Sequence, residues 1–140
     1  MKVAYVQMEP VFLDPEVNYS KAEELIREVA DQGAKLVVLP ELFDTGYNFR
    51  SREEVAEVAG QIPDGPTTEF LVELAKELEV FIVAGTAEKD EKGNLYNSAV
   101  VVGPVGWGAT SGSTGRCTSS TGRSSSSDPE TSASTSSILA

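Results

Sequence analysis

One carboxylate of the sequence stands where an α/β sheet could use it for catalysis. Glu41 directly follows Pro40, which ends the apolar run of residues 36–39. Such a run is typical of a buried strand, and functional groups of α/β sheets gather beyond the carboxyl ends of strands. The apolar neighbours of Glu41 predict an environment that disfavours the charged carboxylate and prepares it as a general base. Taken alone, a glutamate here is more simply explained as a cap of the following turn, so the surrounding pattern decides.

Other residues that commonly carry chemistry are scarce. The chain has one cysteine, Cys117, and no histidine, so an internal disulfide is excluded and a Cys/His zinc site is not expected. Cys117 stands among serines and threonines, with no strand before it and nothing to activate its thiol. We therefore reject it as a nucleophile and predict neither a metal nor a cofactor.

Four apolar runs predict the strands that would position Glu41. They cover residues 2–8, 36–39, 80–85 and 95–102. Their continuous apolar character indicates a sheet that is covered on both faces. A turn at 90–93 predicts that the last two strands form an antiparallel hairpin.

Three helical patterns lie between these strands. The first has Asn18 as its N-cap, one apolar face, and Gly33 at its end. The second is a short helix over 51–59 that opens with capping-box spacing. The third is capped by Thr67 or Thr68. The resulting order, β-α-β-α-α-β-β, predicts an α/β layered fold.

Charge and hydropathy exclude several classes of partner. The formal net charge of -11 comes entirely from residues 1–104. An acidic body repels phosphate backbones and anionic lipid, so we expect no nucleic-acid or membrane partner. No apolar run approaches the roughly 18 residues of a membrane span. The N-terminus lacks a signal-peptide pattern, and the expected location is cytoplasmic.

The composition changes abruptly after Pro104. Residues 1–104 contain three serines, whereas residues 105–140 contain twelve serines, six threonines and five glycines. Such a segment has almost no apolar surface to offset the entropy of ordering it. The sequence therefore predicts a domain over 1–104 and a disordered Ser/Thr/Gly-rich tail over 105–140.

Six segments of the predicted domain, taken in their order and spacing, resemble the nitrilase superfamily of carbon–nitrogen hydrolases. They are Val6-Gln7-Met8, Asn18, residues 33–41 (GAKLVVLPE), Gly46-Tyr47, Val83-Ala84-Gly85 and Tyr96-Asn97-Ser98-Ala99. Each is weak alone, but the set is specific.

The resemblance implies a fold, a reaction and a role for Glu41. The fold would be the N-terminal half of an α-β-β-α sandwich, usually homo-oligomeric. The reaction would be hydrolysis of a small nonpeptide amide or nitrile by a Glu-Lys-Cys triad, with Glu41 as the general base. Tyr47 and Asn48 would lie near the pocket mouth. We interpret residues 96–98 as hairpin and inter-strand hydrogen bonding instead.

The chain departs from the family pattern at its other two catalytic positions. No lysine follows Lys92, where the family has one after the fourth strand, and the family's cysteine would lie beyond residue 140. The chain alone is therefore predicted to be inactive.

The tail itself suggests a frameshift. Read one base earlier, the codons of residues 114–127 permit YRKVHLFYREKLFF, which resembles the family's segment after the fourth strand, with its lysine before a histidine. That lysine overlies Arg116 but is not encoded in the present frame. Asp128 departs, because its shifted codon gives only Gly, Arg or a stop.

Two other interpretations stay open. One is a non-catalytic α/β binding or interaction module with a natural disordered tail. The other is a flavodoxin-like or receiver-type domain, which ranks last because no glycine-rich loop follows the first strand. A hydrolase places Glu41 in a cleft at the strand end, and a binding module need not.

Overall fold

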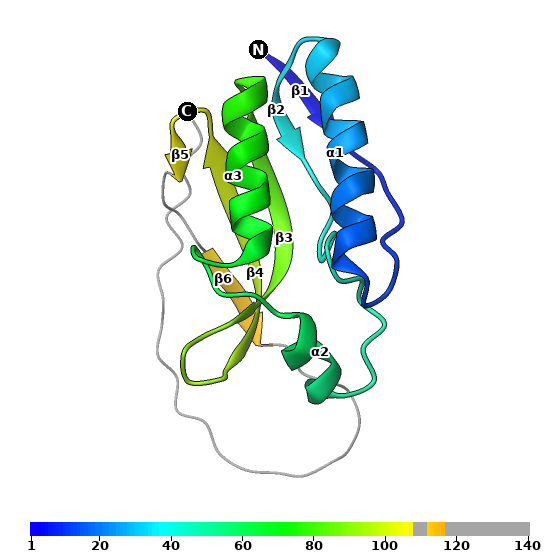
Figure 1. Ribbon diagram of the computed structural model, residues 1–140, viewed down its shortest axis with the longest axis vertical. Coiled ribbons are helices and arrows are strands. Elements are labelled where there is room, and N and C mark those ends of the chain that lie inside the picture. The colour runs from blue at the N-terminus through cyan, green and yellow to red at the C-terminus, as the bar shows by residue number, and fades with distance from the viewer. Residues whose placement is uncertain (108–111, 117–140) are drawn as a thin grey trace.

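The computed structural model describes residues 1–107 and 112–116 of the chain. Its elements follow the predicted order, with two short strands added at the end (Figure 1). They are β1 (Lys2–Tyr5), α1 (Pro15–Asp31), β2 (Ala34–Val38), α2 (Arg52–Val58), α3 (Pro66–Leu78), β3 (Phe81–Lys89), β4 (Leu95–Gly103), β5 (Gly106–Trp107) and β6 (Gly112–Arg116).

These strands form one mixed sheet in the order β1-β2-β3-β4-β5, and β6 also pairs with β4. The pairs β1–β2 and β2–β3 are parallel, whereas β3 and β4 form an antiparallel hairpin. The predicted hairpin is therefore confirmed. Its turn is built on Asp90, whose Oδ1 accepts from the backbone N–H groups of Lys92 and Asn94.

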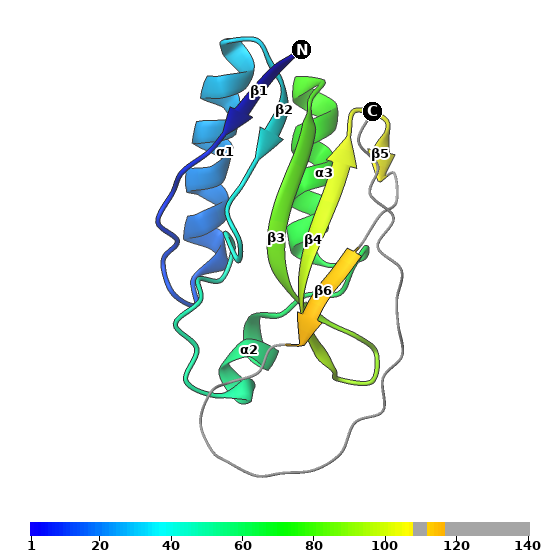
Figure 2. The ribbon, with the colours of Figure 1, turned by 180° about the vertical axis from the view of Figure 1, so that it is seen from behind.

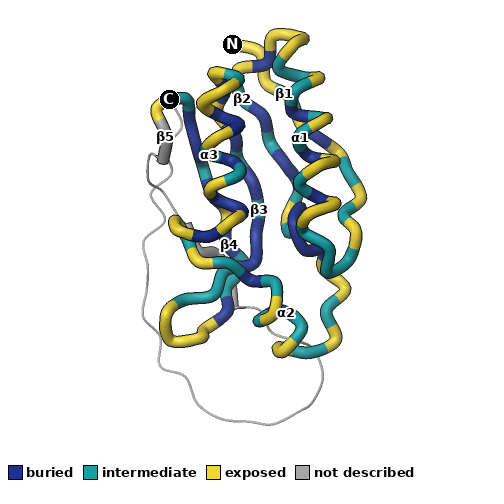
Figure 3. The backbone as a smooth tube through the Cα atoms, in the orientation of Figure 1, coloured by how far each residue is buried: buried dark blue, intermediate teal, exposed yellow. Residues whose placement is uncertain are grey.

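Both long helices lie on the same face of the sheet. Figure 1 shows α1 and α3 side by side in front of the strands, and Figure 2 shows the strands from the other side. The core lies between these layers, and its fully buried members include Ile26 of α1, Leu71 of α3 and Ile82 of β3. Figure 3 shows buried residues, in dark blue, along the strands and on the helices that pack against them. Each such side chain contributes roughly 1.5–3 kcal/mol through its burial.

Within the described part of the chain, neither α1 nor α3 covers the opposite face of the sheet (Figure 2). Register places Val3, Leu36 and Phe81 in one row across β1, β2 and β3, since these residues are partners. The next row holds Tyr5 and Val83, with Val38 between them. We call these rows the open face. Val3, Tyr5 and Phe81 are 55%, 64% and 49% exposed, although parallel strands normally have both faces covered.

The first helix begins earlier than predicted. Asp14, not Asn18, is the N-cap of α1, and its Oδ1 accepts from the Val17 N–H at 3.2 Å. Asn18 is fully buried, because its side-chain amide bonds the backbone of two loops. It accepts from Val11 N, and it donates to Val11 O and to Asp44 O. The prediction of Asn18 as a cap was therefore wrong.

The third helix also begins differently. Gly65 is the N-cap of α3, and neither Thr67 nor Thr68 caps it, since both lie buried in the first turn. A Cβ at Gly65 would lie 2.3 Å from Gln61 O, so only glycine fits there. The capping prediction held for α2, where Ser51 Oγ accepts from the Glu54 N–H at 3.3 Å.

The predicted tail contributes β5 and β6 to the described residues. Both pair antiparallel with β4. Cys117 and the rest of 108–111 and 117–140 lie outside the described residues. Within the described part of the chain, no helix combines the length and apolar character of a membrane span.

Candidate active site

The backbone after β2 carries Glu41 along the edge of β3. Leu39 N donates to Val83 O at 2.8 Å, and Phe43 N donates to Gly85 O at 3.2 Å. Glu41 lies between these anchors, directly over Gly85. A Cβ added at Gly85 would come within 2.7 Å of the Glu41 Cα, so the glycine makes this close approach possible.

A tight turn follows Glu41. Leu42 has a left-handed backbone with φ 48, which costs a residue with a Cβ about 1–2 kcal/mol. The turn is closed by Gly46 N, which donates to Leu42 O at 2.9 Å. Leu42 also packs against the small core around Val55 of α2. These contacts offset the backbone strain and hold the turn in place.

The side chain of Glu41 is exposed and meets one partner from a distant strand. Asn97 of β4 donates from Nδ2 to Glu41 Oε1. The predicted apolar enclosure of Glu41 was wrong, because its apolar neighbours Leu39 and Phe43 are only 4% and 0% exposed and belong to the core. The carboxylate is thus held by a polar contact over the open face of the sheet.

Two hollows meet at Glu41. The first, of about 430 Å³, lies between the loop after β1 and Pro40, and Tyr47 lines it together with Glu41. The second, of about 290 Å³, lies over β3 and β4 and is lined by Glu41, Gly85 and Asn97 among others. Glu41 therefore lines a concavity beyond the end of β2.

The two predicted pocket residues are placed differently. Tyr47 is 67% exposed and forms part of the wall of the first hollow. Asn48 is exposed on the same loop and lines neither hollow. Tyr47 thus lines a hollow together with Glu41, whereas Asn48 lines neither.

Comparison with known proteins decides the family. The sequence profile described as "Carbon-nitrogen hydrolase" matches residues 2–110. The chain belongs to the carbon–nitrogen hydrolase family. The predicted resemblance is confirmed, and so is the mixed α/β fold that it implied.

Curated relatives extend well beyond this carbon–nitrogen hydrolase chain. A nitrilase of Pyrococcus abyssi is 66% identical over 107 residues, which are 76% of this chain and 40% of that protein. The human omega-amidase NIT2 is 42% identical over 89 residues, covering 64% of this chain and 31% of that protein. The chain thus spans well under half the length of these relatives.

Solved structures share the fold. A crystal structure of an N-terminal amidase superposes with a TM-score of 0.72 at 23% identity, covering 79% of this chain and 27% of that chain. Saccharomyces cerevisiae Nit3, a nitrilase-superfamily member, gives a TM-score of 0.66 at 28% identity, covering 76% of this chain and 41% of that one.

Sequence reasoning placed Gly85 and Asn97 in family-like segments of this carbon–nitrogen hydrolase but did not bring either residue to Glu41. The expected hairpin hydrogen bonds do occur on either side of Asn97: Tyr96 OH donates to Asp90 at 3.1 Å, and Ser98 Oγ donates to Glu88. Asn97 itself pairs with Ala87 of β3, and its side chain in addition donates to Glu41. Asn97 lies in a polar stretch at the start of β4, next to Ser98, and nothing local to β4 indicates that its partner is Glu41.

A buried carboxyl beneath the Glu41 turn was also missed. Asp44 is 1% exposed, and its Oδ2 accepts from the hydroxyls of Thr67 and Thr86. Burial raises the pKa of Asp44, and the two threonine hydrogen bonds oppose that shift. Asp44 thus couples the site loop to α3 and β3.

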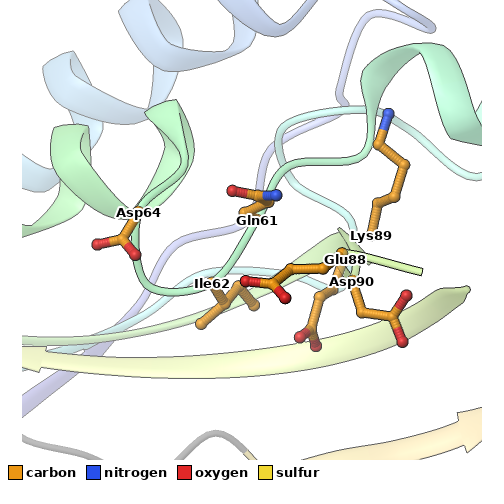
Figure 4. Close-up of a pocket in the computed structure, with 7 residues that line it drawn as sticks. Gln61, Ile62, Asp64, Glu88, Lys89 and Asp90 are labelled. Carbon is orange, nitrogen blue, oxygen red and sulfur yellow. The ribbon is translucent and has the colours of Figure 1, made fainter. Parts of the chain in front are cut away.

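A third hollow, of about 150 Å³, lies at the far end of the hairpin and is acidic (Figure 4). Three of its charged groups, Glu88, Lys89 and Asp90, already have structural partners. Lys89 extends away from the carboxylates and donates to Ala56 O at 2.7 Å, while Asp90 holds the hairpin turn. Among the described residues, no group of three or more His, Cys, Asp or Glu side chains is placed to hold a metal ion.

Proposed function

We propose that the complete protein hydrolyses a small nonpeptide amide or nitrile, with Glu41 as its general base. The observation that carries this proposal is the position of Glu41 at the junction of two hollows, beyond the end of β2. A non-catalytic binding module requires no carboxylate at this point. Family membership supports the same reaction class.

The arrangement suggests how Glu41 would act. Asn97 holds Oε1, which leaves Oε2 for proton transfer. The carboxylate would take the proton of a cysteine thiol, and the thiolate would attack the amide or nitrile carbon. Glu41 would return that proton to the substrate nitrogen. The C–N bond of an amide then breaks and the nitrogen leaves as an amine or ammonia, whereas a nitrile needs a first water to release its nitrogen as ammonia. Glu41 would later take a proton from the water that releases the acyl group. Tyr47, in the wall of the first hollow, would contact the substrate at the mouth.

The missing members of the triad make the present chain inactive in this proposal. The family's lysine position has no counterpart after Lys92, and Cys117 lacks the surroundings of a nucleophile. Purified chain should therefore not turn over simple amides or nitriles. Any turnover above that of a Glu41→Ala control would overturn the proposed inactivity.

A chimera tests the role of Glu41 directly. Residues 1–104 would replace the corresponding part of the Pyrococcus abyssi nitrilase, which is 66% identical to this chain. If the chimera is active, Glu41→Gln should lower kcat by about 10²–10⁴-fold, the usual contribution of a general base. Glu9→Gln, at another carboxylate of the first hollow, is the matched control. Equal activity of the Glu41→Gln and Glu9→Gln chimeras would refute the proposal.

We further propose that residues 105–140 are translated out of frame. In support, the family match ends at residue 110, close to the change of composition after Pro104. Sequencing the gene around codons 104–108 tests this. An intact frame that encodes the same tail in related genes would contradict it.

A further inference from the structure

Three elements converge on one residue of the loop that carries Glu41 and Tyr47. Asp44 lies midway between them in the chain. Its Oδ2 accepts from Thr67 Oγ1 at 2.8 Å, in the first turn of α3, and from Thr86 Oγ1 on β3. Both contacts are buried, so no solvent competes for them.

The network continues from Asp44 to α1. The Thr67 hydroxyl gives its hydrogen to Asp44, so the Tyr19 OH, 2.8 Å from Thr67 Oγ1, is the donor in that pair. The backbone carbonyl of Asp44 accepts from Asn18 Nδ2 at 2.8 Å. Asp44 is thereby tied to α1, α3 and β3 at once.

Stabilisation of the fold does not by itself explain the buried carboxyl of Asp44. Its Oδ1 is buried and makes no hydrogen bond of good geometry among the described residues, although the backbone N–H groups of Asp44 and Thr45 lie near the carboxyl. A buried oxygen that is poorly satisfied costs free energy. Hydrogen bonds, unlike the apolar packing of the neighbouring Phe43, depend on direction. The contribution left to this carboxyl is to orient the turn.

We infer that Asp44 is a positioning residue, which orients the loop so that Glu41 meets Asn97 over Gly85. Its importance for catalysis rests on the proposed function, but its effect on geometry does not. The side-chain amide of Asn97 reports that geometry, because it donates to Glu41.

The test follows the Asn97 side-chain amide signal by NMR in the full chain, with Glu41→Ala marking the position of the free amide. Thr67→Val and Thr86→Val each remove one donor to Asp44 and should move the signal toward that position. The matched control is Thr68→Val, in the same turn of α3. Thr68 is also buried, at 2% exposure against 5% for Thr67, and its hydroxyl has no partner among the described residues. This control should leave the signal in place.

Substitution of Asp44 itself gives a second arm. Asp44→Asn retains an oxygen that accepts from both threonines, so the Asn97 signal should stay close to its original position. Asp44→Ala removes that oxygen and should move the signal to the position of the free amide. The inference is overturned if Thr67→Val and Thr86→Val leave the signal unchanged, if Thr68→Val moves it as far, or if Asp44→Asn is as damaging as Asp44→Ala.

Folding failures are also decisive. If Asp44→Ala does not fold, the threonine variants give the answer. A Thr67→Val chain that fails to fold where Thr68→Val folds counts against the inference, because the network would then hold the core rather than orient the loop. The NMR signal is measured without turnover. The inference about Asp44 can therefore be overturned while the chimera shows Glu41 to be the base, and it can be supported while the chimera shows that Glu41 is not the base.

Discussion

Replacing Gly85 with alanine perturbs the Glu41 position by a single added carbon. The new Cβ would lie 2.7 Å from the Glu41 Cα and 3.2 Å from the Leu42 backbone N. Carbon atoms in ordinary contact are about 3.5–4.0 Å apart. The backbone at Glu41 must therefore move by about 1 Å, since neither partner is a flexible side-chain end.

This shift has two expected magnitudes. Overpacking of this kind costs about 1–3 kcal/mol, so the free energy of unfolding should fall by that amount. In an active chimera, a displacement of about 1 Å at a catalytic group lowers kcat about 10²-fold. The Asn97 amide signal should move as well, because Asn97 donates to Glu41.

Urea titration of the full chain measures the first effect, and chimera kinetics measure the second. Gly60→Ala is the matched control, because a Cβ there would meet Pro66 Cδ at 3.8 Å, an ordinary contact. The reasoning is refuted if Gly85→Ala unfolds at the same urea concentration as Gly60→Ala while the Asn97 signal stays in place.

Two further predictions concern pH and association. Burial raises the pKa of Asp44 in the folded chain. The free energy of unfolding should therefore lose a contribution as pH rises from about 4, the ordinary aspartate value, through that raised pKa. Urea titrations across pH should show this decline missing in Asp44→Asn, and equal pH profiles would contradict it. Phe81→Lys on the open face should lower light scattering by the chain, because exposed apolar patches promote association. Val17→Lys on α1 is the control, since Val17 and Phe81 are 41% and 49% exposed. Equal light scattering by the Phe81→Lys and Val17→Lys chains would exclude the open face as the surface of association.

Local patterns were sufficient for the order of elements. Each apolar run is a property of neighbouring residues, so the strands, the hairpin turn and the end of α1 at Gly33, with φ 89, could be predicted. The start of a helix was less predictable where the expected capping side chain makes hydrogen bonds to distant residues or lies buried. Asn18 bonds two loops instead of capping α1. At α3 the N-cap is Gly65 rather than a threonine, and the backbone of Gln61 leaves no room there for a side chain.

The sequence by itself determined that a carboxylate follows a buried strand, because the four apolar residues of the strand and the proline that ends it directly precede Glu41. Only the tertiary structure decided what that carboxylate meets. Asn97 is 56 residues away in the chain, and strand register brings it to Glu41. Gly85 is required only because the turn after β2 crosses β3 at that point. Such contacts depend on how strands pair across the sheet, and no short stretch of sequence contains that information.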